Sequence, residues 1–213
     1  MKTKALQFIF LTAFFAAGLP GFAQETGFQS IGVFHDTLWL ANSDSDSAPS
    51  PILSVWGFSA RIGIAEKWSI APEIAFSSVE YLYRDDIAYP AEIEYADAVR
   101  TLNIIFSIPV AYRFDPVEDI AIYVNAGPTF SFKVPYRTFG DVSRGDVAGY
   151  FTKKGRFFHW ETGAALEWNF IESLAFYVRT RLVLPMYRMW DGDNMPFYDG
   201  LMFGVGFGLR LIF

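Results

Sequence analysis

The stretch that decides the fold is LMFGVGFGLRLIF, residues 201–213, which ends the chain. Its odd-numbered positions are all apolar, whereas its even-numbered positions include three glycines and an arginine. A helix fails here, because each glycine in its interior would cost about 1 kcal/mol. Period-two alternation predicts a β-strand. Glycines beside Arg210 suit a narrow, filled interior, so we expect the apolar face to point outward.

Seven further segments alternate in the same way and are separated by turn residues. Together with the last segment they predict eight strands. The register of the first is open, because His35 and Asp36 are adjacent polar residues, and the sequence allows a bulge there. The seven segments are 28–40, 56–64, 68–83, 102–114, 120–133, 158–170 and 174–187.

The connections between these segments alternate between short and long. Residues 65–67, 115–119 and 171–173 form short turns. The long connections are polar and rich in Pro, Gly and Asp, and they cover 42–50, 84–98, 135–155 and 189–199. Short turns at one end and long loops at the other are typical of outer-membrane barrels. We therefore predict an all-β, eight-stranded antiparallel up-and-down transmembrane β-barrel.

A soluble barrel would alternate equally well, with its apolar face inside. Two further features favour the membrane version. Aromatic residues gather near the short turns, as in an interfacial girdle, at Trp68, Tyr112, Phe114, Trp168, Phe170 and Phe213. The predicted inward faces carry a barrel-interior charge network of Arg61, Glu73, Glu161, Glu167, Arg179, Arg181 and Arg210.

Residues 1–23 have the features of a signal peptide. Lys2 and Lys4 precede a short apolar run, and Gly21-Phe22-Ala23 is a small-x-small cleavage site. The apolar run is too short for a retained membrane anchor. We expect export through the Sec pathway, removal of residues 1–23, and a mature barrel domain of residues 24–213.

Composition excludes several classes of function. The 213 residues include no cysteine, so disulfides and thiolate metal sites are absent. The net charge of −6 speaks against a nucleic-acid partner, which usually requires a basic patch. We expect no cofactor.

The last strand resembles the C-terminal assembly signal of bacterial outer-membrane barrels, with Val205, Phe207, Leu209 and Leu211 leading to Phe213. The whole mature chain resembles the small eight-stranded proteins typified by outer-membrane proteins X, W and A. This resemblance implies integral localisation in the outer membrane of a diderm bacterium, surrounding lipid, and recognition by the barrel-assembly machinery. We expect a monomer.

The interior charges allow two functions. Paired across neighbouring strands, such as Glu161 or Glu167 beside Arg179 or Arg181, they would form a structural plug, because eight strands leave an interior that side chains can fill. A water path between them would instead make a selective conduit. We favour the plug.

Catalysis and metal binding have weaker support. His35 and Asp36 could meet Ser77 or Ser78, as in lipid A-modifying barrels, but no motif spacing supports this grouping. We expect His159 to be hydrogen-bonded in the interior. Acidic loop residues could hold Ca²⁺ loosely, yet no Glu follows at the spacing of a calcium loop, and we assign no metal site. These residues are Asp44, Asp46, Asp85, Asp86, Asp191 and Asp193.

The longest loop, 135–155, mixes aromatic and basic residues, which suits contact with a ligand. Its Arg144-Gly145-Asp146 resembles an integrin-binding tripeptide. The sequence therefore predicts a non-enzymatic outer-membrane protein that acts through surface loops, on a host or extracellular ligand, and as a wall component. The alternative is a narrow porin-like conduit for small or hydrophobic solutes, and a remote one is a lipid A-modifying enzyme.

Overall fold

The computed structural model describes residues 27–41, 52–84, 87–90, 98–190 and 200–213. The predicted signal peptide and parts of the long loops lie outside this range. In chain order the elements are β1 (Gly27–Leu40), β2 (Ile52–Ala65), β3 (Trp68–Ile70), β4 (Glu73–Arg84), β5 (Ile87–Pro90), β6 (Ala98–Ser107), β7 (Val110–Val117), β8 (Ile120–Thr138), α2 (Arg144–Thr152), η1 (Lys153–Gly155), β9 (Phe158–Ile171), β10 (Leu174–Leu184), η2 (Met186–Met189) and β11 (Met202–Ile212).

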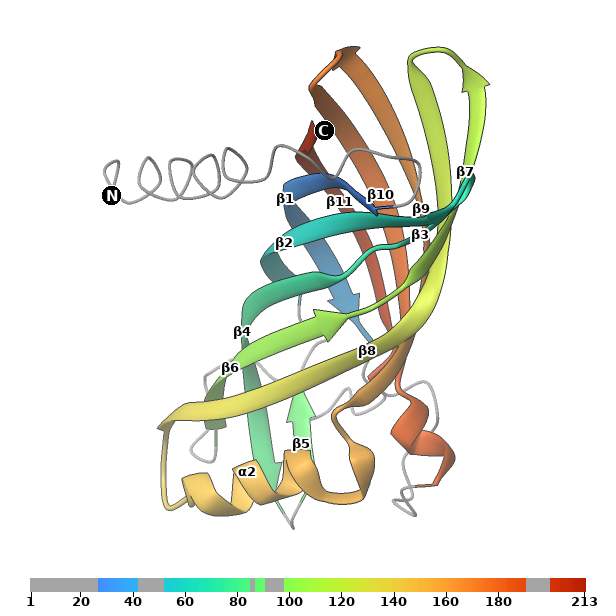
Figure 1. The fold of residues 1–213 in the computed structure, drawn as a ribbon. Helices are drawn as coiled ribbons and strands as arrows, with labels where there is room; N and C mark the ends of the chain where they lie inside the picture. Colours follow the sequence, from blue (N-terminus) through green and yellow to red (C-terminus); the bar gives the residue numbers. More distant parts are fainter. Residues whose placement is uncertain (1–26, 42–51, 85–86, 91–97, 191–199) are drawn as a thin grey trace, which may run out of the picture.

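The strands form one antiparallel sheet that closes on itself. The first and last strands, β1 and β11, pair from Ser30↔Ile212 to Leu40↔Met202 and complete the ring. β3 and β4 are two parts of one strand, as are β6 and β7, and β5 pairs with β4 alone at the end of the sheet order. The described residues therefore form the predicted ring of eight strands, drawn in Figure 1.

Prolines cause both interruptions. A proline lacks the backbone N–H that a strand contributes to its ladder, and Pro72 and Pro109 stand between β3 and β4 and between β6 and β7. The wall nevertheless stays bonded, because their carbonyl groups accept hydrogen bonds from the N–H groups of Ala60 and Ala71, each at 2.9 Å. The ring remains closed at both breaks.

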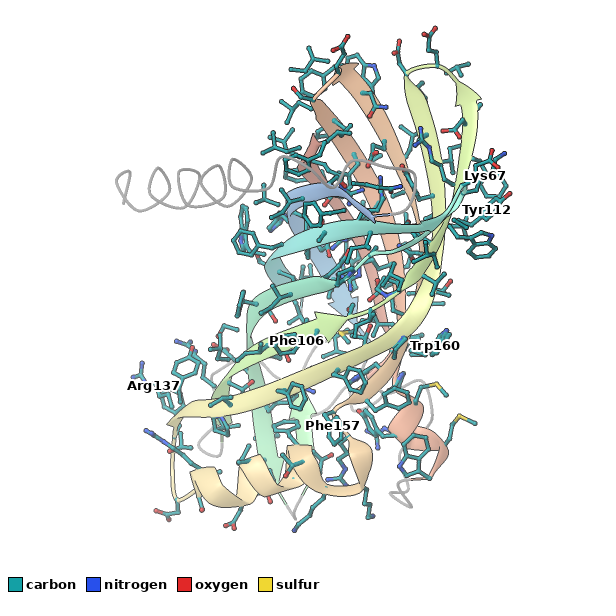
Figure 2. The ribbon with its side chains drawn as sticks, in the orientation of Figure 1. Lys67, Phe106, Tyr112, Arg137, Phe157 and Trp160 are labelled. Atoms are coloured by element: carbon teal, nitrogen blue, oxygen red, sulfur yellow. The ribbon has the colours of Figure 1, made fainter. Side chains whose placement is uncertain are left out.

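The apolar face points outward and the polar face inward. Trp56 is 61% exposed and Phe207 is 52% exposed, whereas Glu161 is 1% exposed. This is the reverse of a soluble barrel, and it confirms the predicted transmembrane type. Aromatic rings contact one another outside the wall near the short turns, where the rings of Trp68 and Tyr112 meet edge to face with their centres 4.8 Å apart (Figure 2).

The structure corrects the prediction in β1, in the predicted loop 84–98, which contains β5, and in the predicted loop 135–155. The bulge in β1 lies between Phe28 and Ser30, near the short turns, and not at His35. Part of the predicted loop 135–155 is the helix α2, which lies across the end of the barrel opposite the short turns (Figure 1). None of the described helices is long and apolar enough to cross a membrane.

Candidate functional site

Two arginines of β10 organise the middle of the lumen. Alternation along the strand points Arg179 and Arg181 inward, and both are almost fully buried. Arg179 donates to both carboxylate oxygens of Asp36, with distances of 2.8 Å and 2.6 Å. Its third nitrogen donates to Glu73 at 2.6 Å. A single guanidinium thus joins two carboxylates.

Arg181 extends this network toward β9. It donates to Asp36 at 2.9 Å and forms an ion pair with Glu161. Glu161 also accepts hydrogen bonds from Ser107 at 3.0 Å and from Thr129 at 2.9 Å. We call the set Asp36, Glu73, Glu161, Arg179 and Arg181 the central cluster.

A second group, the short-turn cluster, lies nearer the short turns and consists of Arg61, Glu167 and Arg210. The guanidinium group of Arg61 donates two parallel hydrogen bonds to the Glu167 carboxylate, at 3.0 Å and 3.2 Å. Arg210 donates to the same carboxylate at 2.8 Å. Arg61 also stacks on Tyr123, with its guanidinium carbon 3.5 Å from the ring centre.

Both clusters reach across the barrel. In the ring, β10 and β4 stand four strands apart, as do β2 and β9, so each pair is opposite in a ring of eight. The Arg179–Glu73 and Arg61–Glu167 ion pairs therefore span the lumen. Such paired, hydrogen-bonded charges fill space that water would otherwise occupy.

Asp36 is a buried charged residue that the sequence analysis did not assign to the interior network. The seven predicted residues comprise four arginines and three glutamates, and all seven are buried in the lumen. Asp36 is 0% exposed and adds a fourth carboxylate, so that the four arginines of the two clusters face four carboxylates. The pairing also differs in part from the prediction: Glu161 binds Arg181, but Glu167 binds Arg61 and Arg210.

The other end of the lumen contains a hydrophobic core and is covered by α2. Ser143 caps this helix by accepting a hydrogen bond from the N–H of Asp146 at 3.4 Å. Val147 and Phe151 of the helix pack into the same hydrophobic core as Tyr81 of β4. Lys133 lies beneath, 4.9 Å from the Phe151 ring centre. The Arg144-Gly145-Asp146 tripeptide is thus exposed in the first turn of a helix and not in an extended loop.

At the short-turn end a vestibule of about 590 Å³ opens toward the short-turn cluster. Both signs of charge line it, from Arg61 and Arg113 to Glu167 and Glu172. The paired side chains of Arg61 and Glu167 form part of this lining.

The catalytic grouping considered from the sequence does not form. Asp36 points inward, while His35 points outward and lies 2.9 Å from Ser54 of β2. Ser77 is buried, and Ser78 bonds Tyr136 at 3.0 Å. His159 is buried in the interior, with its Nδ1 3.3 Å from the Phe157 carbonyl oxygen. The candidate calcium residues lie outside the described part, within which no cluster of acidic or histidine residues could hold a metal.

Solved structures of other proteins share this architecture. Neisserial surface protein A superposes with a TM-score of 0.52 at 11% identity, over 87% of this chain and 96% of that one. Ail, the attachment invasion locus protein of Yersinia pestis, superposes with a TM-score of 0.49 at 13% identity, over 88% of this chain and 99% of Ail. No protein-family model and no curated protein sequence matches the chain.

At these identities the likeness concerns the fold alone. It confirms the architecture predicted from alternation, which is that of a small bacterial outer-membrane β-barrel.

Proposed function

We propose that this transmembrane barrel is a non-enzymatic, integral protein of a bacterial outer membrane, whose closed wall holds extracellular loops for contact with a ligand outside the cell. The supporting observation is Arg179, which joins β10 to Asp36 of β1 and to Glu73 on the opposite wall. Ion pairs that cross the lumen connect opposite walls and occupy the space that a channel would need, so they suit a rigid scaffold better than a channel.

The direction of insertion follows from the asymmetry of the two ends. In outer-membrane barrels the short turns face the periplasm and the long loops face outward. The Sec leader of residues 1–23 and recognition of β11 by the barrel-assembly machinery would deliver the chain in this direction. A monomer suffices, because the ring closes within one chain.

The cap is the surface offered to the ligand. We call the exposed residues of α2, η1 and η2, together with Trp190 directly after η2, the cap surface. It includes the cations Arg144 and Lys153 and the side chain of Trp190, which is 52% exposed. Trp190 is held in place because its indole N–H donates to the Lys154 carbonyl at 2.7 Å. Aromatic side chains and arginine are enriched where proteins bind one another.

Single-channel recording tests the closed wall. Residues 24–213 would be refolded in lipid, checked for a heat-dependent gel shift, and recorded in a planar bilayer. We expect a folded barrel without discrete current steps. Reproducible steps would reject the closed scaffold and support the second candidate, a narrow conduit for small or hydrophobic solutes, which the vestibule at the short-turn end favours.

Adhesion tests the cap surface. Cells that display the protein would be applied to immobilised heparin, an anionic polysaccharide that complements the cations of the cap surface. We expect binding to it, and loss of that binding when Arg144, Lys153 and Lys154 are replaced by serine. The matched control is Lys67→Ser, an exposed cation at the opposite end of the barrel (Figure 2). Equal binding by both variants would reject this contact site.

A further inference from the structure

A groove of about 410 Å³ lies on the outer wall, over β1, β2, β4 and β11. Val33 of β1 lines it between its register partners on β2 and β11, and large apolar side chains of the neighbouring strands line it as well. These are Trp56, Phe58, Phe76, Phe207 and Leu209. The volume is in the range of roughly 300–1,000 Å³ that is usual for small-ligand sites.

The groove faces lipid, because its side chains belong to the outward, apolar face of the barrel. Val33 is 39% exposed and Phe76 is 37% exposed, although both side chains are apolar. In a membrane this surface meets acyl chains and not water. The chemistry of the lining therefore selects a hydrocarbon chain.

One end of the groove is polar. The Nε2 atom of His35 lies 2.9 Å from the Oγ atom of Ser54. The imidazole is held between two aromatic side chains, with its ring centre 4.4 Å from that of Trp56 and 5.7 Å from that of Phe207. A polar pair on a lipid-facing wall is costly unless its hydrogen-bonding capacity is used. Among the described residues, no other polar group contacts His35.

The position of this pair gives the groove a direction. Along β1, His35 is closer than Val33 to the long-loop end, and Ser54 lies beyond Trp56 in the same direction along β2. A lipid of the outer leaflet has the same order, because its polar head is near the cell surface and its chain runs toward the membrane centre. The groove and such a lipid are thus complementary in both polarity and orientation.

We propose that this groove binds one acyl chain of an outer-leaflet lipid, and that His35 and Ser54 hydrogen-bond an ester or hydroxyl oxygen at the head of the chain. The proposal rests on the insertion direction proposed above, but not on whether the lumen conducts.

The geometry favours binding over ester hydrolysis. A serine nucleophile needs a histidine base that a third group orients, and it needs donors for the oxyanion. The nearest carboxylate in sequence, Asp36, points into the lumen and is bonded to Arg179 and Arg181. The described residues provide no other carboxylate contact to His35.

Native mass spectrometry tests the proposal. The protein would be refolded in vesicles of phosphatidylethanolamine, extracted in a mild detergent, and examined for retained lipid. We expect one bound phospholipid on the wild-type barrel. Val33→Trp should abolish retention, because the larger side chain fills the groove. The combined change His35→Phe and Ser54→Ala should weaken retention by about fivefold to tenfold, as expected for one lost hydrogen bond.

Val124→Trp is the matched control, since Val124 is also exposed on the outer wall but lies on β8, away from the groove. This variant should retain lipid like the wild type, and the heat-dependent gel shift verifies that every variant is folded. Equal retention by Val33→Trp and Val124→Trp would overturn the proposal. Recovery of lysolipid and free fatty acid, or of a second copy of the chain in place of lipid, would overturn it as well.

Discussion

Arg179 and Asp36 are 143 positions apart in the sequence, yet they form two parallel hydrogen bonds inside the barrel, at 2.8 Å and 2.6 Å. Asp36 is fully buried and also accepts from Arg181. The pair therefore links β1 to β10 across β11, and it gives the central cluster its anionic centre. Loss of this pair should lower the stability of the barrel.

Asp36→Asn should destabilise the barrel strongly, because it leaves Arg179 and Arg181 partly unpaired in a buried site. Breaking a buried ion pair by removing one partner typically costs about 3–5 kcal/mol. Urea unfolding of the barrel in lipid vesicles, followed by tryptophan fluorescence, measures this change. Asp115→Asn is the control, since the Arg113–Asp115 pair is 43% exposed on both sides and should contribute about 0–1 kcal/mol. Similar losses in both variants would contradict the assigned role of the central cluster.

Gly206→Ala should also impair folding. A Cβ atom at this position would lie 1.9 Å from an Asp36 carboxylate oxygen and 2.7 Å from the His35 carbonyl. Overpacking of this kind costs about 1–3 kcal/mol, and the fraction that shows a heat-dependent gel shift should fall. Gly145→Ala, with its nearest neighbour 3.6 Å away, should leave that fraction unchanged.

Val147→Asp should release the cap from the barrel mouth. Val147 is 0% exposed in the core beneath α2, so a carboxylate there would be buried without a partner. Limited digestion with proteinase K should then cut near α2 while the strands stay intact. Thr152→Asp places the same charge on the exposed side of the helix and should remain resistant. Equal digestion of the two variants would show that the cap is not held by its apolar face.

Phe213→Ala should separate assembly in the cell from stability. The Phe213 side chain is 40% exposed, and its ring contacts Phe28 at a centre-to-centre distance of 5.5 Å, so it lies outside the buried core of the barrel. If the terminal aromatic residue is part of the assembly signal, the variant should be depleted from the outer membrane by several-fold, measured by fractionation, yet refold normally in vesicles. Normal amounts in the membrane would remove Phe213 from the proposed signal.

The strands could be predicted because inward and outward residues alternate with period two over long segments. In β11 every inward position between Gly204 and Arg210 is glycine or charged, so the sequence also indicated which face of the strand points into the lumen. Alternation is uninformative where both neighbours are polar. At His35 and Asp36 only the register with β2 and β11 decides which side chain faces the lumen.

The helix α2 could not be predicted from its own residues. It is short, it contains two glycines, and its sequence shows no clear amphipathic pattern. It is stabilised by packing of Val147 and Phe151 on side chains of the barrel, which local sequence does not report. The breaks at Pro72 and Pro109 also depend on neighbouring strands, whose N–H groups use the proline carbonyls.

The pairing of β1 with β11 determines the order in which the barrel can be made. Before β11 is available, β1 has an unpaired edge. The strand at the other end of the unfinished sheet then has an unpaired edge as well. Exposed edges recruit strands from other chains, and the closing contact joins the two most distant parts of the sequence, which makes it slow to form. The free edges of the unfinished sheet must therefore be protected from other chains until β11 is available. Pairing of β1 with β11 is then a single late step, and without it the sheet stays open.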